Sequence, residues 1–308
     1  MIVRWGLGEL PGVLADLGIE HPFLVASPRW DAPVEIVGRW SEIPSDRARV
    51  DGDADGLLGI GGGSAIDTAK GLSAASGLPL VSVPTTYGGA EWTTFFGVRA
   101  PDRRMRGGGS GAHPAGIVYD VGLTLDLPRD ISGGTALNAL AHCCEALYVQ
   151  GRDPAADPIA LEGSALISHA LPQVLEDGND VGARTELLQG AARGGEALGR
   201  SGLALGHAMA QAIGGAYGLP HGALNAICLP PALRFNADFV PNELLGGRAA
   251  ERAEELAGLS GFTTLGALGV PEGDLPGLAE AIAQRPGTRA NPRPASPDQI
   301  ETLLRSIF

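Results

Sequence analysis

Short apolar runs alternate with polar and glycine-rich stretches along the first part of the chain. The runs FLVAS, VEIVG (34–38), LPLVSVPTT (78–86) and IVYD (117–120), and the GLLGI that opens the glycine segment, have the length and the content of β-branched residues that predict buried strands. Helices are predicted over residues 11–17 and after the glycines of GLLGIGGGSAIDTAKGLSAAS. This alternation predicts an α/β domain of the doubly wound, Rossmann-like class.

Two stretches of this first part depart from the simple alternation. Only PRWDAP separates FLVAS from VEIVG, and this link is too short for the helix that normally connects parallel strands. The stretch RAPDRRMRGGGSGAHPA (99–115) has a glycine cluster that predicts a flexible loop. Its arginines Arg103, Arg104 and Arg106 fit either a solvated charge run or a site for an anionic ligand.

Helical patterns replace strand patterns after Pro128. Helices are predicted over residues 135–149, 158–175, 185–197, 204–213, 222–235, 248–258, 275–283 and 297–308. The segment VGLTLDLP ends the first part. We therefore predict an α/β domain over residues 1–127 and an all-α domain over residues 128–308.

One turn in the first domain has a direct chemical interpretation. Gly61, Gly62, Gly63 and Ser64 connect a predicted strand to a predicted helix, so a ligand can approach the backbone closely. The helix then offers its free N–H groups and its positive dipole end to a phosphate. The spacing is not the G-x-G-x-x-G fingerprint, and a plain tight turn into the helix is the alternative.

The second domain contains the residues on which the functional question depends. Asn138 and His142 are four apart in TALNALAHCCEALY, so they share one face of a helix. His207 and His221 are fourteen apart. Together these side chains form a candidate site for a divalent metal. Polar groups that are simply paired inside a cleft are the alternative.

Composition and charge exclude several classes of protein. The 308 residues are 44% hydrophobic and carry a net charge of −13, which disfavours nucleic acid and anionic membranes as partners. No apolar run is long enough for a membrane span, and MIVRWGLGEL does not resemble a signal peptide. Cys143, Cys144 and Cys228 form no CxxC pair, so we expect free thiols and a cytoplasmic protein.

Taken in order, the motifs GGGSAIDTAK, PTTYGGAEWT, IVYDVGLTLDLP, TALNALAHCCEALY, GGAYGLPHG and ANPRP resemble the iron-containing alcohol dehydrogenase superfamily, and within it the maleylacetate reductase branch. The resemblance implies a dehydroquinate synthase-like fold, with an NAD(P)-binding α/β domain and a helical domain for substrate and catalysis. It also implies a dimer or larger homo-oligomer. The residues that it implies for cofactor binding are Gly61, Gly62, Gly63, Ser64, Asp67, Thr85, Thr86 and Tyr87.

The same resemblance gives the polar cluster its role. In the metal-dependent alcohol dehydrogenases the four metal ligands fall at Asn138, His142, His207 and His221, and the first of them is Asp. Asn at this position is typical of maleylacetate reductases, which the resemblance implies work without a metal. An amide offers a cation only a neutral oxygen, so the case for a metal is weaker, although three histidines can still hold zinc.

Three departures from the family pattern distinguish this chain. Gln211 stands four residues after His207, where the family tends to carry a histidine, and Gln cannot act as an acid or base near neutral pH. Ala115 takes the place of a frequent lysine. The short link after FLVAS lacks much of a helix that the family has beside the adenosine half of the cofactor.

Our leading hypothesis is an NADPH- or NADH-dependent reductase that transfers hydride to a small, anionic oxo or unsaturated acid. His142, His207 and His221 would polarise the carbonyl or donate the proton, and Asn138 would position them. Arg104, Arg106 and Gln211 would bind the substrate. A metal-dependent alcohol dehydrogenase and a descendant without redox activity, such as a lyase, a dehydratase or a binding protein, are the alternatives.

Two further points concern the cofactor side. Tyr87 and Glu91 are weaker candidates for contacts there, and a solvated surface position is the alternative for Glu91. The stretch Ser27-Pro28-Arg29 has no acid before Asp31, which favours NADP over NAD.

Overall fold

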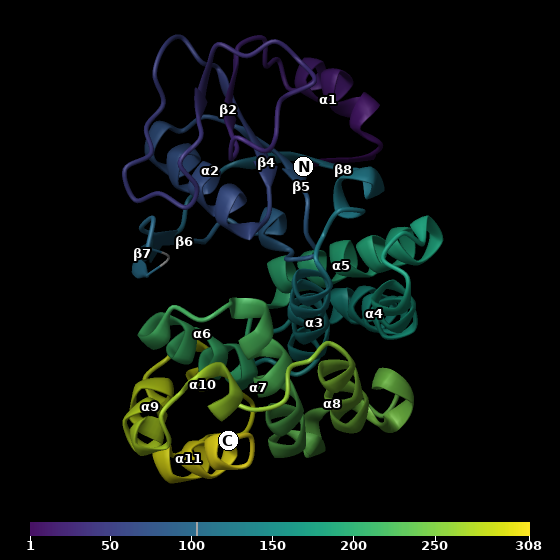
Figure 1. Ribbon diagram of the computed structural model, residues 1–308, viewed down its shortest axis with the longest axis vertical. Coiled ribbons are helices and arrows are strands. Elements are labelled where there is room, and N and C mark those ends of the chain that lie inside the picture. The colour runs from purple at the N-terminus through teal and green to yellow at the C-terminus, as the bar shows by residue number, and fades with distance from the viewer. Residues whose placement is uncertain (103) are drawn as a thin grey trace. The chain divides into compact units, whose positions relative to one another are not determined.

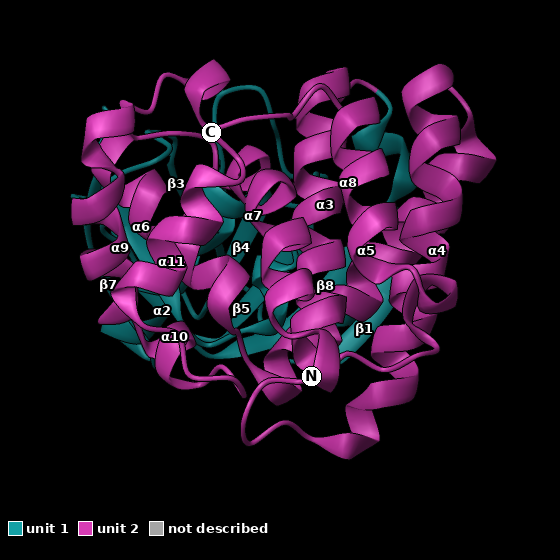
Figure 2. Cartoon of the chain, turned by 90° about the horizontal axis from the view of Figure 1, so that it is seen from below, with its two compact units in different colours: residues 1–125 teal, residues 126–308 magenta. Residues whose placement is uncertain are grey.

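Six parallel strands form the sheet of the N-terminal part of the chain, in the order β1–β8–β5–β4–β2–β3 (Figure 1). The structure is a computed structural model that describes residues 1–102 and 104–308. It divides into unit 1, Met1–Leu125, and unit 2, Asp126–Phe308 (Figure 2). The strands of this sheet are β1 (Ile2–Trp5), β2 (Pro22–Val25), β3 (Gly38–Trp40), β4 (Gly56–Gly61), β5 (Leu80–Pro84) and β8 (Pro114–Tyr119).

Helices cover both faces of this sheet, because successive side chains of a strand point to opposite faces. Leu24 of β2 and Leu58 of β4 belong to a core with α1 (Leu10–Asp16). Their neighbours Phe23 and Leu57 belong to a second core, with α2 (Gly63–Ser76). In both β2 and β4, side chains on the two faces of the sheet are therefore buried. The predicted doubly wound α/β class is confirmed.

The connection between β2 and β3 differs from the prediction. The segment VEIVG was expected to be a strand, but β3 starts only at Gly38 and the link over residues 26–37 contains no helix. The two strands are nevertheless parallel. The guanidinium of Arg39 closes the link, since it donates to the backbone oxygens of Ser27 and Trp30, each at 2.8 Å, and to Asp31 at 2.7 Å.

The predicted flexible loop over residues 99–115 is also wrong. Strands β6 (Phe96–Arg99) and β7 (Met105–Gly109) pair antiparallel there as a separate two-stranded sheet. A Cβ atom at Gly109 would come within 2.8 Å of the Phe96 ring, so glycine is needed for the close packing of this pair. Glycine is a poor strand former, which is why the composition hid the hairpin.

Lys70, the only lysine of the sequence, ties α2 to the segment before this hairpin. Its side chain is 1% exposed, and its Nζ donates to the backbone oxygens of Ala90 and Phe95 at 2.7 and 2.6 Å and to Thr93 Oγ1 at 2.9 Å. Asp67 lies 3.1 Å away as its ion-pair partner. The buried charge is thus satisfied on all sides, as a charge without water requires.

Helices alone build unit 2 (Figure 1). Its α-helices are α3 (Arg129–Ala146), α4 (Asp157–Glu176), α5 (Val181–Ser201), α6 (Leu205–Tyr217), α7 (His221–Phe235), α8 (Ala249–Leu259), α9 (Leu275–Ala283), α10 (Pro286–Arg289) and α11 (Pro297–Arg305). All the predicted helices are present, most of them with shifted ends, and α9 spans the predicted residues 275–283. Helix α10 was not predicted, and α3 begins at Arg129, directly after Pro128. An all-α second part is confirmed.

Helix α3 is the central helix of unit 2. Almost every residue from Ser132 to Ala146 is buried, on all sides of the helix, and it packs on α4, α5 and α7. Small residues allow this close packing, because a Cβ atom at Gly194 of α5 would lie 2.7 Å from the backbone oxygen of Ala139. Polar side chains on α3 are therefore held inside the protein.

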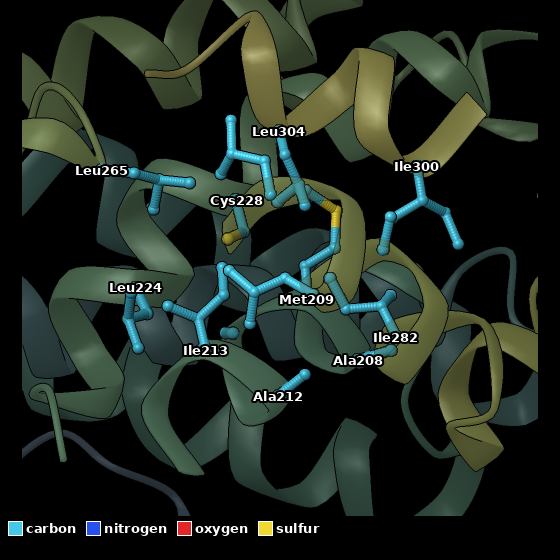
Figure 3. Close-up of a cluster of buried hydrophobic side chains, with 14 of the residues drawn as sticks. Ala208, Met209, Ala212, Ile213, Leu224, Cys228, Leu265, Ile282, Ile300 and Leu304 are labelled. Carbon is cyan, nitrogen blue, oxygen red and sulfur yellow. The ribbon is translucent and has the colours of Figure 1, made fainter. Parts of the chain in front are cut away.

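A second apolar core of unit 2 lies between α6, α7, α9 and α11. Met209, Ile213, Cys228, Ile282 and Leu304 meet in it, and the side chains point toward one another (Figure 3). This core fixes α6 and α7 side by side. Among the described residues, no helix is both long and apolar enough to cross a membrane.

Candidate active site

Three helices of unit 2 bring the predicted polar cluster together. Asn138 and His142 lie one turn apart on α3, His207 lies in the first turn of α6, and His221 is the first residue of α7. The rings of His142 and His207 stack, with 4.8 Å between centroids and 15° between planes. The rings of His207 and His221 are 5.8 Å apart and tilted by 53°. Asn138, His142 and His207 are buried, and His221 is half-buried.

Glu145 of α3 holds one end of this cluster. Its fully buried carboxylate accepts from Nδ1 of His207 at 2.8 Å. It also accepts from the backbone N–H groups of Ala204 at 2.7 Å and of His207 at 3.1 Å. The same carboxylate therefore caps the start of α6 and fixes the His207 ring. When Nδ1 of His207 carries the proton, Nε2 has none, and Nε2 has no hydrogen-bond partner among the described residues.

Asn225 of α7 holds the other end. Its amide nitrogen donates to Oδ1 of Asn138 at 2.6 Å and lies 3.0 Å from Nε2 of His221. For the second contact to be a hydrogen bond, Nε2 of His221 must accept, so a neutral His221 carries its proton on Nδ1. Asn225 thus links the amide of α3 to the histidine of α7.

Three buried polar atoms of the cluster have no hydrogen-bond partner among the described residues: Nδ1 of His142, Nε2 of His207 and Oδ1 of Asn225. Burial lowers the pKa of His142 well below its ordinary value, and the neighbouring His207 and His221 lower that pKa further. His142 is therefore neutral near neutral pH. Unsatisfied buried groups are rare in native proteins, so three of them together suit a site for a polar ligand or for bound water.

The four side chains do not fit a divalent metal as they stand. Oδ1 of Asn138 and Nε2 of His221, two of the four candidate ligand atoms, both face the amide nitrogen of Asn225. The rings of His142 and His207 lie face to face instead of converging on one point. In the described part of the chain no three His, Cys, Asp or Glu side chains are arranged as a metal-holding group.

Unit 1 carries the glycine turn at the carboxyl end of β4. Gly61 has a φ of 145°, and a Cβ atom there would lie 2.8 Å from that of Ala65. Gly62 precedes α2, and no described side chain caps this helix. A Cβ atom on Gly63 would meet nothing within 4 Å. The turn therefore combines uncapped N–H groups with open space, which suits a phosphate.

The segment after β5 lies next to this turn. The Thr85 N–H donates to the backbone oxygen of Gly61 at 3.0 Å, and a Cβ atom at Gly62 would come within 2.9 Å of the Thr86 methyl group. Tyr87 is fully buried. The predicted cofactor residues of the two segments are thus brought together. Ser64 lies in the first turn of α2, and Asp67 is bonded to Lys70 and to the Gly97 N–H.

Glu91 is buried, so its interpretation as a solvated surface residue is wrong. Only 3% of the residue is exposed, and its carboxylate accepts a 2.6 Å hydrogen bond from the Tyr119 hydroxyl. Burial raises the pKa of Glu91, while the bond from Tyr119 and the charge of Lys70 lower it, with a net rise. Tyr119 is the last residue of β8, and Glu91 lies in the segment that follows β5.

The predicted substrate residues lie in both units. Arg104 and Arg106 are exposed near and on β7, and Arg106 pairs with Asp102 at 3.2 Å. Arg103 lies outside the described residues. Gln211 is half-buried on α6, one turn after His207. Of the predicted substrate residues, Gln211 is therefore the one that lies on the same helix as a member of the cluster, His207.

Glu145 and Asn225 were missed in the sequence, although both have a spacing that could have revealed them. Glu145 follows His142 by three residues and Asn225 follows His221 by four, so each shares a helix face with a histidine. Asn225 does contact the His221 ring one turn away, whereas Glu145 bonds His207 of α6 and not His142.

Comparisons with known proteins cover almost the whole chain. Residues 133–308 match the C-terminal part of the Fe-containing alcohol dehydrogenase family, and residues 46–120 match iron-containing alcohol dehydrogenase. Maleylacetate reductase 1 of Cupriavidus pinatubonensis is 34% identical, with 97% of this chain and 92% of the relative covered. Maleylacetate reductase 1 of Rhodococcus opacus is also 34% identical, over 83% and 73%.

The solved structures agree with the sequence relatives. The crystal structure of maleylacetate reductase from Agrobacterium tumefaciens has a TM-score of 0.88 and 30% identity to this chain, and the match covers 100% of this chain and 95% of that one. Fold, sequence and glycine turn all agree with the resemblance that the motifs indicated. The chain belongs to the iron-containing alcohol dehydrogenase family and is an NAD(P)-dependent oxidoreductase.

Proposed function

We propose that the chain is a reductase of the maleylacetate reductase type, which reduces a small oxo or unsaturated carboxylic acid without a metal. The observation that carries the proposal is the position of Asn225, whose amide nitrogen faces two of the four candidate metal-ligand atoms, those on Asn138 and His221. The relatives with 34% identity that bear the name maleylacetate reductase support the reaction type.

Unit 1 supplies the cofactor residues in this proposal. The bound nicotinamide nucleotide provides the hydride. Gly61, Gly62, Gly63 and Ser64 hold its pyrophosphate through backbone N–H groups and the positive end of α2. Thr85, Thr86 and Tyr87 form the neighbouring wall. Asp67 acts indirectly, since its carboxylate is committed to Lys70 and to the backbone of Gly97.

Unit 2 supplies the groups that orient the substrate and handle the proton. Glu145 holds Nδ1 of His207, so Nε2 is the atom that bonds the substrate oxygen. In the protonated ring, Nε2–H donates to a carbonyl oxygen and can pass on its proton as charge develops there. His142 stays neutral and stacks on His207, which holds the ring in place. Asn138 and Asn225 fix His221 on the other side.

The remaining site residues fit an anionic substrate. Arg104 and Arg106 would pair with a carboxylate, because a guanidinium binds it through two parallel hydrogen bonds. Gln211 would bond a polar group of the substrate without proton transfer, since its amide does not titrate. The proposal includes a cytoplasmic homodimer. Cys143, Cys144 and Cys228 are all free and buried, which fits a reducing compartment.

The direct test is turnover of maleylacetate with NADPH or NADH by protein whose metal content has been measured. We expect turnover without stoichiometric metal and with no loss after dialysis against EDTA. Activity that is lost with EDTA and restored by Fe²⁺ or Zn²⁺ would favour the metal-dependent alcohol dehydrogenase. Binding of neither nucleotide would favour a descendant without redox activity.

Asn138→Asp tests the metal question from the opposite side. A carboxylate at this position offers a charged oxygen beside three histidines, and we expect it to take up Co²⁺, seen as visible absorption bands of the bound ion. Asn138→Ala is the control, because it removes the amide without adding a charge. Strong Co²⁺ binding by the unchanged protein would contradict a metal-free site.

A further inference from the structure

The turn after β2 lies directly beside the glycine turn that is proposed to hold the pyrophosphate. Strands β2 and β4 are parallel neighbours, with Val25 opposite Gly59. Continued by two residues, this register brings Ser27 level with Gly61, about 5 Å away across the sheet. Whatever follows Ser27 is therefore adjacent to the next part of a dinucleotide held at Gly61–Ser64.

Arg39 gives this turn a fixed shape. Its guanidinium binds the backbone oxygens of Ser27 and Trp30 and the carboxylate of Asp31, across the link over residues 26–37. The Ala26 N–H donates to the backbone oxygen of Trp40 at 3.1 Å, which joins the start of the link to the end of β3. Hydrogen bonds therefore hold the short link in one turn conformation, at the place where the family resemblance implies a helix.

The turn Ser27–Asp31, together with the arginine that closes it, carries one net positive charge, and Glu35 lies further along the link. The turn carries Arg29, whose guanidinium lies 5.0 Å from the centre of the Trp30 ring, and it is closed by Arg39. Asp31 is its acid, and that carboxylate is bonded to Arg39 at 2.7 Å. Ser27, two residues after the end of β2, is neutral. An acid at this place in a Rossmann-like sheet binds the ribose 2′-hydroxyl of NAD, whereas a nearby arginine accommodates the 2′-phosphate of NADP.

We propose that the turn Ser27–Asp31 makes this chain selective for NADPH, with Arg29 as the residue that binds the 2′-phosphate and Arg39 as the residue that positions the turn. The inference rests on the proposed function, because it needs a dinucleotide at the glycine turn. Ser27 admits the phosphate since it adds no negative charge, and the Trp30 ring keeps the Arg29 guanidinium at the surface of the turn.

The test is a set of equilibrium titrations with NADPH and NADH, followed by tryptophan fluorescence or calorimetry on the full chain. We expect NADPH to bind at least about ten-fold more tightly than NADH, the scale of one charge-assisted hydrogen bond. Arg29→Ala should remove most of this difference by weakening NADPH alone. Ser27→Asp should reverse the preference, because a carboxylate repels the phosphate and binds the free ribose hydroxyls.

Arg49→Ala is the matched control. Arg49 lies over the Trp40 ring at 6.0 Å, in the same unit, much as Arg29 lies over Trp30, and it also pairs with Asp51 at 3.3 Å. Its loss should leave the affinities for both nucleotides unchanged. Equal binding of the two nucleotides, or tighter binding of NADH, would overturn the inference and leave the proposed function intact. Binding of neither nucleotide would instead refute the proposed function. Adenosine 2′,5′-bisphosphate, which should compete better than AMP, provides a readout without the nicotinamide.

Discussion

At the scale of single residues, Glu145 is the side chain on which the geometry of the histidine cluster depends. It is fully buried, yet it accepts hydrogen bonds from two backbone groups at the start of α6 and from the His207 ring. The same contacts that begin the helix also orient the ring. Oε2 accepts from both the Ala204 N–H and Nδ1 of His207, whereas Oε1 accepts from the His207 N–H, so a substitution that replaces one oxygen by NH₂ tests the contact with the ring.

Glu145→Gln is that substitution. The glutamine oxygen can still accept from a backbone N–H, but its NH₂ group cannot accept from Nδ1–H of His207 and would drive the proton to Nε2. We expect a folded protein whose kcat is about 10- to 100-fold lower, with a reversed His207 tautomer in ¹⁵N NMR. Asp180→Asn is the control, because Asp180 caps α5 through the Ala183 N–H without touching a histidine. An unchanged kcat would rule out this positioning role.

The raised pKa of Glu91 predicts how the stability of the folded protein depends on pH. Burial raises its pKa in the folded protein above the ordinary 4.5, so between 4.5 and the raised pKa the folded state binds more protons than the unfolded state. The contribution of Glu91 to the free energy of unfolding must then fall as the pH rises through this window, by up to about 1.4 kcal/mol per pH unit.

Denaturant unfolding of the unchanged protein and of Glu91→Gln between pH 4.5 and 7 measures this effect. The variant keeps an oxygen for the Tyr119 hydroxyl but does not titrate. Relative to it, we expect the unchanged protein to lose stability as the pH rises. Exposed Glu35→Gln should show no such trend. Parallel pH profiles for the unchanged protein and Glu91→Gln would contradict the raised pKa.

Sequence reasoning identified the members of the candidate cluster and missed the residues that hold them. Asn138, His142, His207 and His221 are recognisable because their types and spacing suit a site. Glu145 is an ordinary helix residue until α6 brings His207 to it, and Asn225 reaches Asn138 only because α3 and α7 pack together. The sequence does not state which helices are neighbours, so the partners of a buried carboxylate cannot be read from it.

At the scale of elements, the start of α2 allows a paired test of the glycine turn. Gly63 at α2 and Gly12 in α1 both have nothing within 4 Å of an added Cβ atom. Alanine at either position should leave the folded protein as stable as before, or more stable by up to about 1 kcal/mol. Only Gly63→Ala should weaken nucleotide binding, because its methyl group occupies the space that we assign to the phosphate.

Titration of both variants with NADPH, beside thermal unfolding of each, provides the measurement. Weaker binding by Gly63→Ala with full stability supports the phosphate at α2. If Gly63→Ala binds NADPH as well as Gly12→Ala does, the pyrophosphate does not lie on this turn.

The elements that the sequence pattern missed are held in place by a few specific contacts, and not by a regular row of their own buried apolar residues. Strand β3 starts four residues later than expected, at Gly38 instead of Val34, and its link is closed by Arg39. The hairpin of β6 and β7 is polar and rich in glycine, and the Phe96 ring and Lys70 hold it. Periodicity detects strands that bury alternate side chains, and neither of these does so.

At the scale of the whole molecule, the two units can be followed by different signals. All four tryptophans, Trp5, Trp30, Trp40 and Trp92, lie in unit 1. Far-UV circular dichroism is governed mainly by helices, and most of these lie in unit 2. Fluorescence and circular dichroism therefore report on different parts of the same chain.

We expect NADPH to raise the midpoint of the unfolding transition detected by tryptophan fluorescence. A ligand that binds only the folded state at 100 times its Kd adds about 2.7 kcal/mol of stability. Adenosine, which lacks the phosphates, should have a far smaller effect. A fluorescence transition that NADPH does not move would place the nucleotide outside unit 1.

The buried position of Lys70 has a consequence for chemical labelling. Within these 308 residues it is the only side chain with a primary amine, and 1% of it is exposed in the folded state. Reagents directed at amines can therefore reach no lysine while unit 1 remains folded. Acylation of Lys70 would mark only those molecules in which α2 has separated from the segment before the hairpin, so the single lysine is a built-in reporter of local opening.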